Sequence, residues 1–218
     1  MKLSPEQIEL QDTVRAFFQD ALPSTYLRAR IADSKRRDEG LWQRLAELGL
    51  DEGFGAEPPI FSVEELALIA FEAGYALCPE PVVARMLGAY VAPRLAALRY
   101  DPAPTAIAPP ACCDLVLDPT SGELRGSIVG APGCEGAEQI IAFASTPHGP
   151  RGVLIQLSAK GVSTEPCPAL DLTVALSTLS IHAAPAQTFP GQASAIVEDL
   201  IEAIYACEAA GLCQRVIE

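Results

Sequence analysis

The sequence has no long hydrophobic run and is poor in basic residues. No apolar stretch approaches the roughly 20 residues that a membrane-spanning helix needs, so we expect no insertion into a membrane. The chain carries 28 acidic and 15 basic side chains, which gives a net charge of -13. Nucleic acids and anionic membrane surfaces are bound through clustered Lys and Arg, and this charge balance argues against both as partners.

Patterns typical of metal, disulfide and hydrolase chemistry are also missing. The seven cysteines show no C-x-x-C spacing and predict neither a zinc site nor a disulfide framework. A bond between the neighbours Cys112 and Cys113 would need strained geometry, so we expect isolated, reduced thiols. His148 in a turn and His182 after an apolar run have no G-x-S-x-G motif beside them, and we expect surface or structural roles for both. No export signal is present, which favours a cytoplasmic protein.

The first hundred residues carry helical patterns with recognisable helix starts. Ser4 and Gln7 have the spacing of a capping box, and Ser62 and Glu65 repeat it. Helical patterns cover 4–22, 26–34, 41–48, 66–77 and 82–98, whereas glycines and prolines in 51–60 predict a loop. Gly49 is suited to end the third helix in a left-handed conformation. The aromatic residues that we expect in the core of this helical domain are Phe17, Phe18, Trp42 and Phe71.

The stretch 122–190 has the opposite pattern. Short apolar runs at 140–144, 153–157 and 176–181 are separated by Gly and Pro, which is typical of a small antiparallel β domain. Prolines gather between 101 and 110 and indicate a boundary before it. After Gly191 the pattern is helical again, with Ser194 as a plausible N-cap and an apolar face broad enough to need partners.

Four glycines in this stretch invite a phosphate-binding interpretation. Gly126, Gly130, Gly133 and Gly136 are closely spaced, but a dinucleotide fingerprint requires a helix directly behind the loop. Here the glycines lie in a β region. A role in turns and bulges is the better interpretation, and a phosphate-cradling role remains the alternative.

Several stretches, in their order and spacing, resemble the acyl-CoA dehydrogenase family. They are Leu41–Leu50, Val63–Pro81, Leu124-Arg125-Gly126 with Ile140–Ala144, Lys160-Gly161-Val162, Leu170–Thr173 and Glu202–Gly211. The resemblance implies an α+β fold in three parts. These are an all-helical N-terminal domain at 1–100, a small antiparallel β-barrel or sandwich at 101–191, and one helix of an incomplete C-terminal four-helix bundle at 192–218.

The resemblance also implies a chemistry. Enzymes of this family are FAD-containing oxidoreductases that remove two hydrogens across the Cα–Cβ bond of an acyl-CoA thioester in lipid catabolism. A glutamate takes the α-proton, the flavin accepts the β-hydride, and an electron-transfer flavoprotein receives the electrons. The cofactor performs the redox step, and the protein orients it and supplies the base. Members are homo- or hetero-oligomers.

The sequence departs from the family at the flavin. By resemblance, the flavin-facing positions are Ala108, Pro110, Gly130, Ala131 and Pro132. They lack the hydroxyl and the stacking aromatic that the family uses there, and proline has no backbone N–H.

No catalytic residue is assigned, because the family's glutamate lies further along the chain than Glu218. We interpret Glu198, Glu202 and Glu208 as solvated or interface charges. The leading hypothesis is an acyl-CoA dehydrogenase-like flavoprotein that needs a partner chain or further C-terminal residues for activity. The alternatives are a structural subunit or relic of the same fold that binds no FAD, and an acyl-CoA-binding module without redox chemistry.

Overall fold

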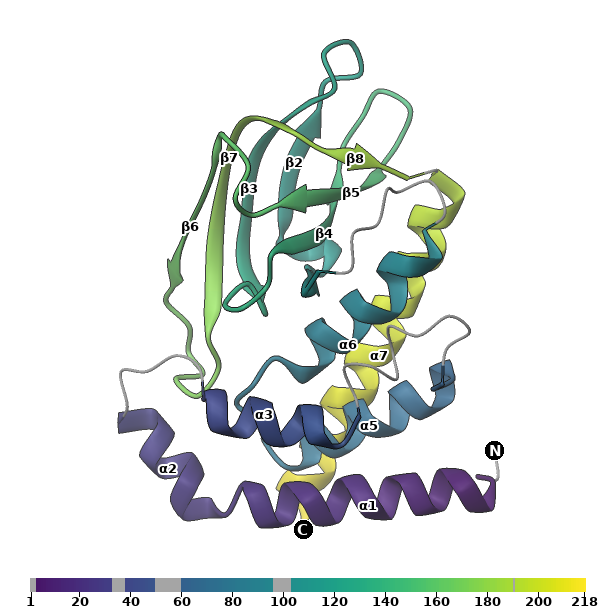
Figure 1. The fold of residues 1–218 in the computed structure, drawn as a ribbon, viewed down its shortest axis with the longest axis vertical. Coiled ribbons are helices and arrows are strands. Elements are labelled where there is room, and N and C mark those ends of the chain that lie inside the picture. The colour runs from purple at the N-terminus through teal and green to yellow at the C-terminus, as the bar shows by residue number, and fades with distance from the viewer. Residues whose placement is uncertain (1–2, 33–37, 50–59, 96–102, 190) are drawn as a thin grey trace.

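The computed structural model places helices first, two sheets next and one long helix last (Figure 1). It describes residues 3–32, 38–49, 60–95, 103–189 and 191–218. The predicted α+β order is therefore confirmed. The loop predicted at 51–60 lies almost wholly outside the described residues.

The helices form one end of the molecule and the strands the other. The helices are α1 (Pro5–Ala21), α2 (Ser24–Ala32), α3 (Glu39–Glu47), α5 (Val63–Tyr75), α6 (Val82–Val91) and α7 (Gly191–Ile217). The strands are β1 (Thr105–Ile107), β2 (Cys113–Leu117), β3 (Glu123–Pro132), β4 (Gln139–Ala144), β5 (Arg151–Gln156), β6 (Val162–Cys167), β7 (Leu176–Pro185) and β8 (Gln187–Thr188). Helix α7 leaves the sheets and runs back through the helical end, so the C-terminus lies near α1 (Figure 1).

Both predicted capping boxes are present. The Ser4 hydroxyl accepts from the Gln7 amide at 3.2 Å, and the Gln7 side chain accepts from the Ser4 amide at 3.0 Å. Ser62 and Glu65 repeat the arrangement at 3.3 and 2.7 Å. Each box satisfies two backbone N–H groups that the first helical turn leaves without partners. Gly49 follows α3 with a φ of 73°, as its position predicts.

The strands form two four-stranded sheets, ordered β1-β4-β5-β8 and β2-β3-β7-β6. All the strand pairs are antiparallel except β1 with β4, which is parallel. Strand β1 lies against α6, where a Cβ on Gly88 would come within 2.2 Å of the Thr105 carbonyl oxygen. Packing against α6 thus sets the position of β1 in its sheet. Local sequence patterns do not predict this contact, because the two segments are distant in the chain.

Strand β3 contains the bulge that its glycines predict. Its register with β7 shifts between Ile128 and Ala131, and Gly130 lies inside the shift with a φ of 76°. A left-handed residue at a bulge is best served by glycine, because no Cβ collides with the backbone. The glycine-rich stretch is therefore a set of turns and bulges.

Two hydrophobic cores hold the molecule together. One fills the helical end around Phe18, and it is extended by Phe189 and by Ile201 of α7. The other lies between the sheets around Leu124 and Ile140. Of the four predicted core aromatics, Phe18 is buried, Phe17 and Trp42 pack partly buried against the same core, and Phe71 is half-buried.

Helix α7 crosses α5 with the two backbones in contact. A Cβ on Gly74 would lie 1.9 Å from the Glu208 carbonyl oxygen, and a Cβ on Gly211 would lie 1.9 Å from the Phe71 carbonyl oxygen. Only glycine permits this approach. The paired positions run in opposite directions along the two helices, so the crossing is antiparallel. It also fixes where the middle of α7 lies.

The N-cap prediction for α7 is wrong. The helix already includes Gly191, and Ser194 is buried inside its first turn. The Ser194 hydroxyl instead accepts from the Gly152 amide of β5 at 2.8 Å and ties the helix to the sheet. Within the described residues, no helix is long and apolar enough to cross a membrane.

Candidate functional site along helix α7

A cavity of about 300 Å³ lies where three parts of the molecule meet. Its walls include Cys78 and Glu80 from the turn between α5 and α6, Gly130 and Pro132 from β3, and Tyr205 and Glu208 from α7. Concave sites of this kind, at the junction of separate structural units, are the usual places where proteins bind small molecules.

A second cavity of about 500 Å³ adjoins the first. The two share Cys78, Val174, Tyr205 and Glu208, so they meet along one face of α7. The larger cavity is lined mainly by apolar side chains, among them Leu77 and Leu212. We call the two together the α7 cavity.

The end of α5 shapes this cavity with a strained residue. The Cys78 amide donates to the Ala73 carbonyl at 3.0 Å and the Leu77 amide to the Gly74 carbonyl at 3.1 Å, which is the bonding of a Schellman cap. Glycine normally occupies the left-handed position of this cap. Here it is Leu77, with a φ of 57°, and its side chain lines the cavity while 42% exposed. A left-handed leucine costs about 1–2 kcal/mol, and such strain is found where function requires it.

Glu208 is a carboxyl on the cavity wall whose environment alters its pKa. Burial raises the pKa of its carboxyl to about 7. It makes no hydrogen bond or ion pair with any residue that the structure describes. Glu208 is partly buried, and its interpretation as a solvated or interface charge stays a prediction. By contrast Glu202 is exposed, and Glu198 is partly buried with its pKa raised by burial and by the charges of Glu202 and Asp199.

Tyr205 lies one turn before Glu208 on the same helix face. Its hydroxyl is buried and has no hydrogen-bond partner among the described residues. Burial, and to a lesser extent the negative charge of Glu208, raises the pKa of Tyr205. Burial likewise raises the pKa of the nearby Cys78 thiol to about 12, so Cys78 stays protonated.

The positions predicted for the flavin lie beside the cavity. Gly130 and Pro132 line its smaller part, together with Pro109. Ala108 and Ala131 are fully buried in the core between the sheets. The Cys112 thiol donates to the Gly130 carbonyl at 3.9 Å. The structure thus brings the two predicted segments together, and whether they contact a flavin stays a prediction.

The groups at these positions do not fit the flavin contacts that the family resemblance implies. The Ala108 amide already donates to the Ile141 carbonyl at 2.9 Å, and prolines 109, 110 and 132 have no amide hydrogen. None of the five predicted positions carries a hydroxyl or an aromatic ring. A Cβ on Gly130 would find only Leu176, at 4.0 Å, so the space is open and without a stacking partner.

The histidines and cysteines that the sequence analysis considered form no catalytic or metal-binding group among the described residues. His148 and His182 are exposed, as expected. All seven cysteines are free, and Cys112 and Cys113 are not bonded to each other. No cluster of His, Cys, Asp or Glu that could hold a metal ion occurs in the described ranges.

Comparison with known proteins assigns the fold. No family model and no curated protein matches this sequence. Among solved structures, the chain is similar to the steroid acyl-CoA dehydrogenase Tcur3481-Tcur3483, with a TM-score of 0.81 at 23% identity over 97% of this chain. The fold is therefore that of the acyl-CoA dehydrogenases, as the sequence resemblance predicts.

Two further structures agree. The ChsE4-ChsE5 complex from Mycobacterium tuberculosis matches with a TM-score of 0.78 and 17% identity over 98% of this chain. Butyryl-CoA dehydrogenase from Megasphaera elsdenii matches with a TM-score of 0.69 and 14% identity over 100% of this chain. This chain spans 64%, 65% and 68% of the length of these three chains, in the order named.

Proposed function

We propose that this chain is one subunit of an acyl-CoA dehydrogenase-type flavoprotein in which a partner chain supplies most of the FAD site. The observation that carries the proposal is the donor-poor lining at the flavin positions. An ordinary flavin-binding subunit needs hydrogen-bond donors and an aromatic surface there, and this chain provides proline and glycine next to the α7 cavity.

A partner of the same fold agrees with the surface of α7. The apolar side chains of Leu212, Val216 and Ile217, close together near the end of α7, are exposed by 42%, 78% and 82%. Exposed apolar residues grouped on one element are typical of protein interfaces. Two of the similar solved structures bear the names of two different chains, which supports a heteromeric arrangement.

The contribution of this chain to the assembly is the apolar wall of an acyl-binding slot. The α7 cavity has apolar walls from the helical end, from the β7 side and from α7, and it opens beside the predicted flavin positions. An acyl group placed there would contact apolar side chains from all three. Acyl-CoA is therefore the ligand class that we propose.

The test is to measure FAD in the chain alone and in its complex with an acyl-CoA dehydrogenase-type subunit that co-purifies with it. We expect the chain alone to be colourless and to leave the fluorescence of added FAD unchanged, and the complex to be yellow. Val216→Glu places a charge on the exposed apolar surface of α7 and should weaken the complex, whereas Glu202→Gln is the matched control on the same helix. Stoichiometric FAD binding by the isolated chain, or failure to form any such complex, would contradict the proposal.

A second function is favoured by one observation. Glu208 has a pKa near neutrality in a cavity beside the predicted flavin positions, which suits a general base. In that case this chain would supply a general base to the assembled complex, whose partner chain supplies the FAD site. Loss of acyl-CoA-dependent bleaching in the complex on Glu208→Gln, with its FAD content unchanged, would establish this role.

A further inference from the structure

We propose that Leu77 is a specificity-determining residue of the α7 cavity. Together with Leu27 it closes the end of the cavity that lies away from the predicted flavin positions, and so limits the length of the acyl group that can bind. The inference rests on the proposed function, since it names the acyl groups that the slot accepts. It assigns no catalytic step.

Leu27 and Leu77 lie between the α7 cavity and a further cavity of about 280 Å³. Both residues line the larger part of the α7 cavity, and both line the further cavity as well. Among the described residues the two linings share no others. The remaining walls of the further cavity come from α1, α2, α5 and α7, and we call it the α1 cavity. The two leucines therefore form a partition between two cavities.

The partition lies at the end of the α7 cavity away from the predicted flavin positions. Gly130 and Pro132 line the smaller part of the α7 cavity, and that part shares no described lining residue with the α1 cavity. The order is thus smaller part, larger part, partition and α1 cavity. An acyl group whose reacting end lay beside Gly130 would extend through the larger part and meet the partition with its far end.

Leu77 occupies a backbone position that favours glycine. Its φ is 57°, at the point of the Schellman cap where glycine is usual. Its neighbours Ala76 and Cys78 pack against the helical core, whereas the Leu77 side chain borders two cavities and is 42% exposed. Burial in the core therefore does not offset the backbone strain. Strain of this kind is retained where the side chain has a function, and a limit on ligand length is a function that the position allows.

The α1 cavity could hold more of an acyl chain if the partition were absent. Phe18, Leu22 and Ala76 continue an apolar wall behind the partition. The charged residues Arg15 and Glu72 in the same lining are bonded to each other at 2.6 Å. A chain that passed Leu77 would therefore gain further apolar contacts, and these contacts favour binding.

The experiment measures binding of straight-chain acyl-CoA thioesters, from butyryl-CoA to stearoyl-CoA, to the full chain by isothermal titration calorimetry. For wild type we expect the affinity to rise with acyl length and to stop rising at a limiting length. Leu77→Gly removes the side chain and suits the left-handed backbone. The limiting length should increase by about two carbons or more. The longest thioester should bind about tenfold more tightly than to wild type, as burial of about two further methylenes predicts.

Leu77→Ala and Leu212→Ala are a matched pair of truncations. Leu212 also lines the larger part of the α7 cavity and is 42% exposed, but it does not line the α1 cavity. Leu77→Ala should increase the limiting length, whereas Leu212→Ala should leave it where it is in wild type. The strain has its own readout: the equilibrium constant for unfolding should be about threefold smaller in Leu77→Gly than in Leu77→Ala.

Equal limiting lengths in wild type, Leu77→Gly and Leu77→Ala would overturn the inference, and so would an equal shift in Leu212→Ala or absence of binding at every length. A limit that moves with Leu77 in a chain that forms no flavoprotein complex would contradict the proposed function and leave the role of Leu77 standing. A yellow complex whose limiting length does not depend on Leu77 would support the proposed function and overturn the inference.

Discussion

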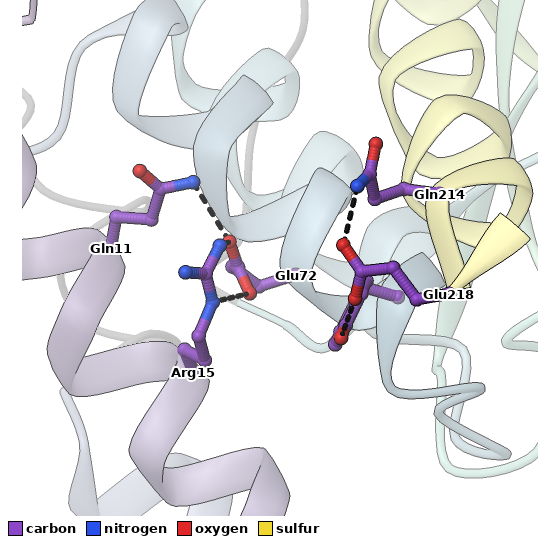
Figure 2. A network of polar contacts seen from close by, with 6 residues as sticks. Gln11, Arg15, Glu72, Gln214 and Glu218 are labelled. Atoms are coloured by element: carbon purple, nitrogen blue, oxygen red, sulfur yellow. Dashed lines mark hydrogen bonds and ion pairs between the residues drawn. The ribbon is translucent and has the colours of Figure 1, made fainter.

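Arg15 of α1 donates two hydrogen bonds to the buried carboxylate of Glu72 on α5, from Nε to Oε2 at 2.9 Å and from Nη2 to Oε1 at 2.6 Å. Gln11 adds a third at 2.8 Å, and Figure 2 shows both α1 side chains converging on Glu72. Beside them, Glu218 near the end of α7 accepts from Gln214 (Figure 2). Glu72 is only 1% exposed, so its charge depends on these partners. The contact fixes α5, which in turn positions α7 and the cavity.

Removal of Arg15 should destabilise the protein strongly. Arg15→Ala leaves the Glu72 carboxylate buried with Gln11 as its remaining described donor, and we expect the free energy of unfolding to fall by about 3 kcal/mol. Chemical denaturation monitored by circular dichroism measures it. Arg125→Ala is the control, since Arg125 and Glu123 form a pair with side chains 63% and 42% exposed. That variant should cost about 0–1 kcal/mol, and an equal loss in both variants would contradict the account.

The crossing of α5 and α7 should not tolerate a methyl group. In Gly74→Ala or Gly211→Ala the new Cβ would collide with a backbone carbonyl at 1.9 Å, so the helices must separate. We expect a loss of about 1–3 kcal/mol from such overpacking, measured by thermal or chemical denaturation.

Gly191→Ala is the matched glycine control on α7. The nearest atom to its new Cβ is Arg151 Nη1 at 3.7 Å, an ordinary contact. Alanine is the better helix former by about 1 kcal/mol, so this change should be neutral or mildly stabilising. If all three alanine variants behaved alike, the backbone contact between the helices would not be as close as described.

Glu208 should make the protein less stable as pH rises, because its pKa is raised in the folded state. The folded carboxyl has a pKa of about 7, and an unfolded glutamate about 4.3, so the folded state holds its proton over this window after the unfolded chain has lost it. Stability from this group is fully present below the lower value and is lost as pH rises through the upper one.

The measurement compares wild type with Glu208→Gln, which stays uncharged. The stability of wild type relative to the variant should fall by about 2 kcal/mol between about pH 5 and about pH 8. Glu202→Gln removes an exposed carboxylate from the same helix and controls for the loss of one charge. A difference between wild type and Glu208→Gln that stays constant with pH would show that Glu208 is solvated.

Thiol reactivity should single out one cysteine. Cys213 is exposed, whereas burial raises the pKa of Cys113 to about 11 and of Cys78 and Cys134 to about 12. The thiolate is the reactive species, so a thiol reagent should modify Cys213 first in the folded protein. Peptide mapping after brief labelling identifies the site. Cys213→Ser should remove the fast phase and Cys134→Ser should keep it; early labelling of Cys78 would mean that the α7 cavity opens to solvent.

The sequence predicts well those features that depend on near neighbours. Ser4 with Gln7 and Ser62 with Glu65 are local partners, and both capping boxes form as predicted. The Ser194 prediction failed for the converse reason, because the hydroxyl bonds to Gly152, 42 positions away. A side chain with a distant partner does not reveal it through its own neighbours in the chain.

Some residues of the candidate site were predicted from the sequence and others were not. Gly130 and Pro132 are identified by family resemblance, and the structure places them on the cavity wall. The raised pKa of Glu208 was not predicted, because a glutamate on a helix is usually solvated. The available signal was Gly211, three residues later, since a glycine in a helix interior indicates that another backbone passes close by on that face.

The sequence by itself determined the α+β order, the helix starts at Ser4 and Ser62 and the bulge at Gly130, because each depends on the conformational preferences of residues within a few positions. Tertiary structure alone decided that Glu208 is partly buried with a raised pKa, that the Tyr205 hydroxyl is buried, and that a left-handed Leu77 lines the same cavity. The reason is the meeting of α5 and α7 at Gly74 and Gly211. That contact joins segments more than a hundred residues apart and depends on the packing of the whole molecule.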